Sequence, residues 1–331
     1  MSQPTVKTVE TAAAVDRVLE WASRAPSVHN TQPWTWRVHN TRIDLFADFR
    51  RQLVHTDPQR RDLLISCGAA LHHLQVAAGA LGWAPQVYRA PDPGDDRVVA
   101  TVELTRTAPP PDGAKTLALL GRRVTDRRRL SSWPVPPERL DALAMAGSTW
   151  GAHVIPIEQE RTKARLERLV RRADGLQQQS SQYRDEVDTW VTESDSQGVP
   201  AGHVPQPDTV DTSDALTRRF LRGTLEDLVL DGAAPGDGML LICTSSDDPL
   251  SRIRAGEALS AMWLQATCDN LSLVPLSQAL EVAATRRILQ NDVLDNLAVA
   301  QLMLRVGWPP MSRSELSPTP RRALDESRVR Y

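Results

Sequence analysis

The chain has 331 residues, with 39 Lys and Arg against 41 Asp and Glu and a formal net charge of −2. This globular composition excludes disordered and fibrous classes, and the near-neutral charge gives no electrostatic basis for binding nucleic acid. No continuous apolar run reaches the roughly 18–20 residues that a bilayer requires, so no membrane partner is expected. The N-terminus lacks the apolar core of a signal peptide, and the three cysteines form no metal-spaced pair. We therefore expect a cytoplasmic protein of two domains, at roughly 100–200 residues per domain.

The first third of the chain predicts two helices and four strands. Pro26 ends the first helix because proline disfavours helical backbone in the residue before it. The second helix is unusually apolar along its length and ends at Gly82. Two alternating segments flank the turn at 39–41, which predicts a hairpin. The expected helices cover 11–24 and 60–82, and the strands cover 34–38, 43–46, 85–90 and 97–105.

A proline-rich stretch at 106–113 separates two halves of the sequence. Its Pro-Pro-Pro run can continue neither a helix nor a central strand. We place the domain boundary there, with 1–110 as the first domain and 111–331 as the second. The second domain is expected to hold helices over 114–121, 137–147, 159–175, 179–191, 214–230, 250–270 and 291–299, and strands over 153–157, 239–244, 272–276 and 301–306.

The segment 192–213 is polar and long for a connection within a compact domain. Such segments are usually functional lids or disordered inserts. Apart from prolines, its only aliphatic side chains larger than alanine are Val199, Val204 and Val210. We expect a lid that cannot form a core of its own.

The two long apolar helices are internal repeats of one another. Gly68-Ala-Ala-Leu71 aligns with Gly256-Glu-Ala-Leu259 without gaps, and the helix, loop and strand before each also correspond. This pattern predicts a duplicated α+β unit. The two helices are expected to pack together as a dimer interface does, here within one chain.

The loop after the first helix carries neutral hydrogen-bonding side chains between two prolines. It reads Pro26-Ser27-Val28-His29-Asn30-Thr31-Gln32-Pro33-Trp34. Such groups on a rigid loop suit a flat heteroaromatic ligand. The alternative is a helix-to-strand connection whose side chains cap local backbone. For His29 the sequence leaves two interpretations open, an exposed side chain and a catalytic one.

A second polar constellation is Arg123-Val-Thr125-Asp-Arg127. In extended backbone, period 2 places its two guanidinium groups and the hydroxyl on one side, as in a phosphate cradle. The alternative is a solvated basic strand. The adjacent His72 and His73 point in different directions on a helix without ligands beside them, so no metal site is expected. The chain also lacks the Gly-x-Ser-x-Gly and Gly-x-Gly-x-x-Gly signatures.

Both constellations resemble motifs of the nitroreductase superfamily of FMN enzymes, and the tandem arrangement is similar to its Acg-type members. The stretch from Ala255 to Ser277 resembles the family's central helix and the strand whose end meets the flavin. The segments 304–309 and 320–322 resemble its last core strand and its basic tail. The resemblance implies an α+β fold: two tandem nitroreductase-like domains forming a pseudo-dimer, each a mixed sheet packed with helices around a long central helix.

The resemblance also implies one intact FMN site per chain, because 147–153 lacks the loop motif found at 26–34. The second half, with its tail, would hold the phosphate and ribityl chain, and its strand end would approach the flavin N5 through backbone. The first half would reach the ring. The implied residues are Arg123, Thr125, Arg127, Arg321 and Arg322 for the phosphate, Pro275, Leu276 and Ser277 at the strand end, and Pro26, Ser27, Asn30 and Gln32 at the ring.

The implied activity is transfer of hydride from NADH or NADPH through FMN to a nitroaromatic or quinone acceptor. It requires no acid–base side chain, so no catalytic residue is assigned. The alternative is an FMN sequestration or storage protein, in which the lid over the flavin prevents turnover. The duplicated helices occupy the surface through which single-domain relatives dimerise, so we expect a monomer.

Overall fold

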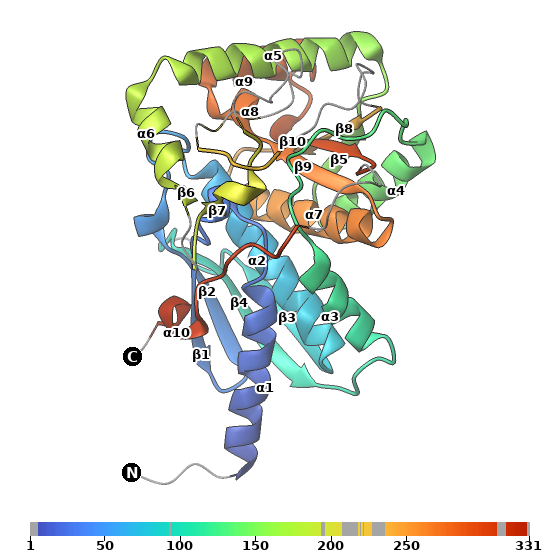
Figure 1. Ribbon diagram of the computed structural model, residues 1–331. Helices are drawn as coiled ribbons and strands as arrows, with labels where there is room; N and C mark the ends of the chain where they lie inside the picture. Colours follow the sequence, from blue (N-terminus) through green and yellow to red (C-terminus); the bar gives the residue numbers. More distant parts are fainter. Residues whose placement is uncertain are drawn as a thin grey trace.

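The computed structural model describes residues 6–92, 94–192, 196–206, 218, 220, 222–226, 236–309 and 316–329. In these residues the chain forms two α+β halves, each with a four-stranded sheet and a 20-residue helix. The two helices are α2 (Arg61–Ala80) and α7 (Pro249–Cys268), which meet where the halves join (Figure 1). This is the predicted α+β pseudo-dimer.

The first half is built on a sheet with the strand order β1-β2-β4-β3. Every neighbouring pair is antiparallel, and β1 and β2 form the predicted hairpin. Helix α2 covers the sheet and is itself almost wholly buried, as in the core helix of a globular domain. The elements are α1 (Val6–Ala22), a 3-10 turn (Val28–Asn30), β1 (Trp34–His39), β2 (Arg42–Ala47), a second 3-10 turn (Phe49–Arg51), β3 (Trp83–Arg89), β4 (Val98–Arg106) and α3 (Gly113–Arg122).

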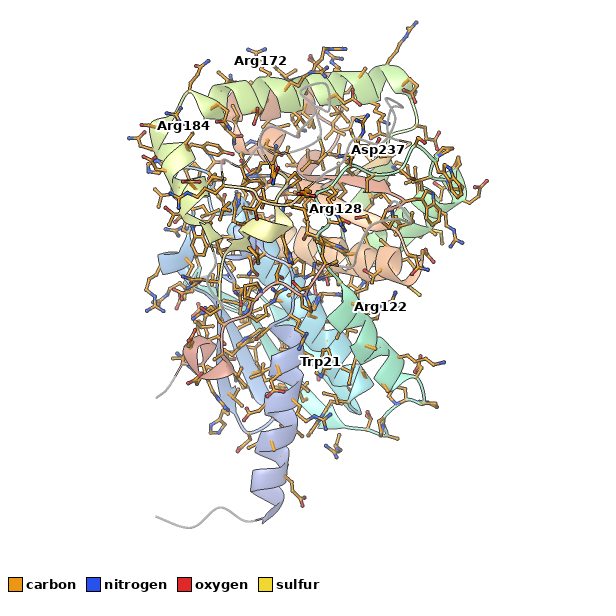
Figure 2. All side chains as sticks on the ribbon, viewed as in Figure 1. Trp21, Arg122, Arg128, Arg172, Arg184 and Asp237 are labelled. Atoms are coloured by element: carbon orange, nitrogen blue, oxygen red, sulfur yellow. The ribbon has the colours of Figure 1, made fainter. Side chains whose placement is uncertain are left out.

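The second half repeats this plan with the strand order β5-β8-β10-β9, again antiparallel. Helix α5 spans its outer side, and exposed Arg172 projects from it into solvent (Figure 2). The elements are α4 (Pro137–Ser148), β5 (His153–Pro156), α5 (Glu160–Gln178), α6 (Ser181–Thr189), β6 (Val191–Thr192), β7 (Val199–Pro200), a 3-10 turn (Ala201–His203), β8 (Gly238–Thr244), β9 (Ser272–Leu276), α8 (Gln278–Glu281), α9 (Ala283–Asp292), β10 (Val299–Gly307) and α10 (Leu324–Ser327).

The contact between α2 and α7 is symmetric in the way that an isologous dimer interface is. A Cβ added at Gly68 would lie 2.1 Å from the carbonyl oxygen of Ile253, and one at Gly256 would lie 1.9 Å from that of Ile65. These are equivalent positions of the sequence repeat. The two glycines therefore allow the helix backbones to touch, and the predicted internal repeat is confirmed as a pseudo-two-fold arrangement.

Segments that follow the proline-rich stretch also pack against the first sheet. Leu120 of α3 is buried in the core of the first sheet, although it follows the proline-rich stretch. The tail crosses from the second half to the first, where Arg328 forms a parallel bridge with Trp36 of β1 (Figure 1). The named strands of both four-stranded sheets are antiparallel, so among the described residues this bridge gives the first sheet its parallel component, while β6 and β7 form a separate parallel pair. The boundary near residue 110 stays a prediction.

Two predicted helices are wrong where the structure describes them. Residues 222–226 of the helix expected over 214–230 are not helical, and Leu225 forms a bridge with Pro205. The helix expected over 291–299 lies earlier, as α9, and ends at Asp292. The residues after it include Asp295 and Asn296 with positive φ angles of 48° and 58°, which no helix accommodates.

Candidate functional site

An open cavity lies where the two halves meet, with about 1080 Å³ of space between its walls when open solvent at its mouth is included. Helices α2 and α7 form its floor, and the end of β9, the 26–30 loop and the tail form its walls. Ten of the twelve predicted site residues line it together: Pro26, Ser27, Asn30, Arg123, Thr125, Arg127, Pro275, Leu276, Ser277 and Arg321.

The loop from the first half enters the cavity in unusual backbone geometry. His29, Asn30 and Gln32 have φ angles of 45°, 54° and 48°, in the left-handed region that side chains other than glycine rarely adopt. The Ser27 hydroxyl accepts a hydrogen bond from the backbone N–H of Gln32 at 2.9 Å and so holds the turn closed. Strained backbone of this kind persists where the surroundings fix it, typically at functional sites.

Three arginines on one side of the cavity have donors without partners. The buried atoms lacking a hydrogen bond include Nε and Nη1 of Arg123, Nη1 of Arg127 and Nε of Arg321. Burial, followed by repulsion from neighbouring guanidinium groups, lowers the pKa of Arg123 to about 9 and that of Arg127 and of Arg321 to about 10. Buried unpaired donors are costly, and a bound anion would satisfy them. These three side chains therefore fit a phosphate group.

Arg128, the residue after Arg127, differs from these three arginines because it has a carboxylate partner. Arg128 contacts Asp126 through Nε and Nη2, both at 2.8 Å, and does not line the cavity. The period-2 argument holds for this segment, because Arg123, Thr125 and Arg127 face the cavity while Asp126 and Arg128 pair with one another.

Described residues between β6 and β8 contact the 26–34 loop and line part of the cavity; residues 196–206, 218, 220 and 222–226 are called the cover below. The side-chain amide of Asn30 donates through Nδ2 to the carbonyl oxygen of Gly198 at 2.8 Å. The side-chain amide of Gln32 donates through Nε2 to the carbonyl oxygen of Ser196 at 2.9 Å. The rest of the expected lid, residues 193–195 and 207–213, lies outside the described residues.

Apolar side chains of the cover are buried against a neighbouring helix. Val199 and Val204 pack with Phe220 and with Tyr183 and Val187 of α6. The cover lacks a core of its own, as its composition requires, but it shares one with α6.

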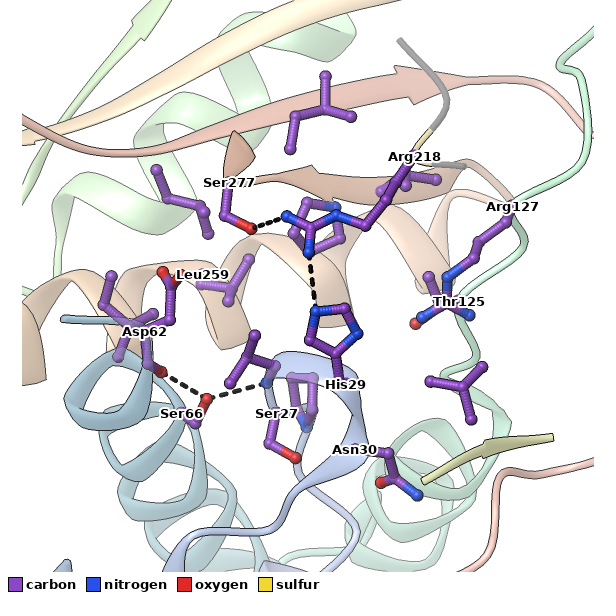
Figure 3. A pocket seen from close by; sticks show the side chains of 18 of the residues that line it. Ser27, His29, Asn30, Asp62, Ser66, Thr125, Arg127, Arg218, Leu259 and Ser277 are labelled. Atoms are coloured by element: carbon purple, nitrogen blue, oxygen red, sulfur yellow. Dashed lines mark hydrogen bonds between the residues drawn. The ribbon is translucent and has the colours of Figure 1, made fainter. Parts of the chain in front are cut away.

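Arg218 of the cover reaches into the cavity and contacts both halves (Figure 3). Its guanidinium donates to His29 Nε2 at 2.7 Å and to the Ser277 hydroxyl at 3.2 Å, and it forms a buried ion pair with Glu281. Burial, followed by the charges of Arg218 and Arg127, holds the pKa of His29 well below its ordinary value. His29 is thus a buried neutral side chain, which excludes the exposed interpretation.

Gln32 and Arg322 are the two predicted residues that do not line the cavity. The Gln32 side-chain oxygen accepts from the Arg322 amide at 2.9 Å, and the Arg322 guanidinium donates to the Gln32 carbonyl at 3.2 Å. They join the tail to the loop directly behind the site. Their contacts are those of positioning residues.

Several lining residues lie outside the motifs that drew attention to this site. They come from helices α2 and α7, from the cover and from strand β10: Asp62, Ser66, Arg218, Phe220, Trp263 and Arg305. The internal repeat was the available signal for the helix residues, because it places α2 and α7 against each other. Arg123 stacks over the Trp263 ring at 4.6 Å, which ties the phosphate side to α7.

Comparison with known proteins decides the family. The chain is 38% identical over 318 residues to Rv3131 of Mycobacterium tuberculosis, which carries the provisional name NAD(P)H nitroreductase, and covers 91% of it. The chain belongs to the nitroreductase family. The nitroreductase-named protein Acg of the same organism is 29% identical over 327 residues, covering 96% of both chains. No family model matches the sequence.

Among solved structures, the nitroreductase-named protein of Anabaena variabilis aligns with 93% of this chain and 90% of its own, at 12% identity and a TM-score of 0.41. That score is too low to carry a conclusion. Family membership therefore rests on the sequence relatives, whose lengths show that both halves of this nitroreductase-family chain occur together in one polypeptide.

Proposed function

We propose that the chain binds FMN in this cavity and acts as an FMN-dependent oxidoreductase, taking electrons from NADH or NADPH and delivering them to a nitroaromatic or quinone acceptor. The observation that carries the proposal is the set of buried, unpaired guanidinium donors on Arg123, Arg127 and Arg321. A phosphate group would satisfy these donors, and they lie in the segments that resemble the family's phosphate-binding motif and basic tail.

The remaining lining residues suit the other end of the cofactor. Thr125 and Arg127 lie on one side of the cavity, while Ser27, Asp62 and Ser277 lie on the other (Figure 3). A phosphate held by the arginines would direct the flavin ring toward this second side. There the neutral loop of the first half would bind the ring edge, and the backbone at the end of β9 would approach it.

Bound flavin would supply the hydride chemistry, accepting from a nicotinamide and donating to the acceptor. The chain would orient the ring, exclude water and hold the acceptor against it. The names of the relatives support NAD(P)H as the donor.

The test is direct. Denaturation of one sample of purified protein releases the bound flavin, which chromatography identifies. A second, native sample is mixed anaerobically with NADPH. We expect FMN and bleaching of its visible absorption band. Absence of flavin after incubation with excess FMN would overturn the proposal.

Storage of FMN is the second candidate, favoured by the cover. Val199, Arg218 and Phe220 all line the cavity, so the cover occupies space beside the ligand. A nicotinamide must stack on the flavin ring to deliver hydride, and a closed cover would obstruct it. Bound FMN that NADPH does not bleach would favour storage over turnover.

A further inference from the structure

Asp62 occupies a place between two cavities. It lies in the first turn of α2 and lines the main cavity on the side away from Thr125 and Arg127 (Figure 3). It also lines a second cavity, formed by the 56–59 loop together with α8 and α9. Pro58, Gln59 and Ala283 on the rim of that second cavity are exposed. Asp62 thus connects the redox end of the proposed flavin site with a separate route to solvent.

The charges that face Asp62 come from every element around it. Burial, followed by repulsion from Asp57 and Glu281, raises its pKa well above the ordinary value, while Arg61 and Arg218 act in the opposite direction. Arg286 of α9 also interacts electrostatically with Asp62. Part of the positive charge is committed elsewhere, because Arg218 pairs with Glu281 and Arg61 pairs with Asp247. Asp62 itself is half-buried, and these surroundings favour its protonated carboxyl form over the carboxylate.

We propose that Asp62 is the proton donor for reduction of the acceptor, an inference that rests on the proposed function. A quinone needs two electrons and two hydrogens to become a hydroquinone. Hydride supplies both electrons and one hydrogen. The Asp62 O–H bond breaks as a new O–H bond forms on the acceptor oxygen, and the resulting carboxylate takes a proton from solvent through the second cavity.

The first test needs no flavin. Infrared difference spectra between the wild type and Asp62→Asn, recorded across a pH titration, isolate the carboxyl band of Asp62. We expect a protonated carboxyl that persists well above the ordinary aspartate pKa of about 3.9. A band that titrates at that ordinary value would overturn the proposal.

The second test measures reoxidation of the dithionite-reduced, FMN-loaded protein by benzoquinone in stopped flow. In the wild type the rate falls as pH rises through the Asp62 pKa, because the acid form is the active one. In Asp62→Asn the rate is independent of pH in that range and roughly 10²-fold lower, the usual scale of general acid catalysis. Asp62→Glu restores the pH dependence.

Hexacyanoferrate(III), which takes electrons without protons, is the control acceptor. It should reoxidise the wild type and Asp62→Asn at equal rates. Slowing of Asp62→Asn with both acceptors, or an unchanged pH profile with benzoquinone, would overturn the role of Asp62. Flavin content is measured beforehand, and a chain that retains no FMN would overturn the proposed function instead.

Discussion

At the scale of single residues, the site is defined by charge that the protein does not neutralise. Arg123 is 6% exposed and stacks on Trp263, yet the hydrogen bond recorded for its guanidinium is a long one, 3.4 Å, to the Arg24 carbonyl. Asp126 pairs with Arg128 and leaves Arg123 without a carboxylate partner. Such an arrangement costs folding free energy and is useful for binding an anion.

Arg123→Ala is therefore expected to weaken FMN binding by roughly 1.5–3 kcal/mol, the range for a hydrogen bond to a charged group. Isothermal titration of flavin-free protein measures the loss. Because Arg123 is buried, added salt should change this difference little. Arg122→Ala is the matched control, since that neighbouring side chain is exposed and does not line the cavity. Equal losses in both variants would contradict the phosphate assignment.

At this scale the sequence predicted the motif residues and missed those that arrive by tertiary packing. Period-2 spacing places Arg123, Thr125 and Arg127 on one side of extended backbone, and the resemblance to the nitroreductase family favoured a phosphate site over a solvated basic strand. Asp62 and Arg218 lie in segments whose local sequence is ordinary. Their position in the cavity depends on contacts between residues far apart in the chain, such as Arg218 with Ser277, which local patterns do not encode.

At the scale of elements, the α2–α7 crossing depends on its two glycines. Gly68→Ala places a methyl group 2.1 Å from the Ile253 carbonyl oxygen, and rigid helix backbone cannot move aside. We expect a loss of about 1–3 kcal/mol or more in the free energy of unfolding, as for other overpacked cores. Denaturant unfolding followed by circular dichroism measures it.

The same helix provides the control for this prediction. A Cβ at Gly79 would meet no atom within 4 Å, so Gly79→Ala tests helix propensity without steric conflict. It should be neutral or stabilising by up to about 1 kcal/mol. If Gly68→Ala unfolds at the same denaturant concentration as Gly79→Ala, close backbone contact is not what joins the halves.

The cover depends on a different element contact, the buried ion pair between Arg218 and Glu281 of α8. Arg218→Ala removes that pair and the contact with His29, and should open the cover. We expect faster reduction of bound FMN by NADPH and faster loss of FMN on dilution, both measured by flavin absorbance and fluorescence.

Arg222→Ala is the matched control for the cover. Arg222 belongs to the same segment, but its side chain is 67% exposed and pairs with Asp188 of α6 outside the cavity. Both rates should stay at the wild-type value in this variant. Unchanged rates in Arg218→Ala as well would mean that the cover does not obstruct the nicotinamide, and the storage candidate would lose its support.

Elements with strong periodicity were predictable, and those that depend on one backbone angle or one distant partner were not. Helices α2 and α7 follow from long apolar runs. The helix expected over 291–299 fails because Asp295 and Asn296 adopt left-handed backbone, which ends any helical path there. Leu297, within that range, is 87% exposed and packs against no core.

At the scale of the whole molecule, the pseudo-two-fold axis relates two places that differ in whether their charged side chains are paired. One is the cavity with its unpaired arginines. At the other, positions equivalent to Ser66 and Trp263 hold Arg254 and Gln75. Both contact Glu257, which is fully buried and bound by Arg89 at 2.7 Å. Charge at this second place is thus neutralised within the protein.

Aromatic side chains also occupy the region around Glu257, which is the pseudo-two-fold equivalent of the cavity. The 147–153 loop, which aligns with the flavin loop of the first half, contributes Trp150, whose ring lies 4.3 Å from that of His72. His72 in turn hydrogen-bonds Ser260, its own counterpart in the repeat, at 2.7 Å. A ligand there would have to displace a buried ion pair and a packed indole, both of which are costly.

We therefore predict one FMN and one chain per native particle. The first number follows from one set of unsatisfied phosphate ligands, and the second from the use of the α2–α7 interface within the chain. Native mass spectrometry of the FMN-saturated protein measures both at once, as a 36.6 kDa chain plus a single flavin. Two flavins per chain would mean that the Arg89–Glu257 pair yields to a ligand and that the asymmetry of the halves is not functional. A particle of twice the mass would instead show that the duplicated helices leave a further self-complementary surface, and the equivalence between one chain and a nitroreductase dimer would fail.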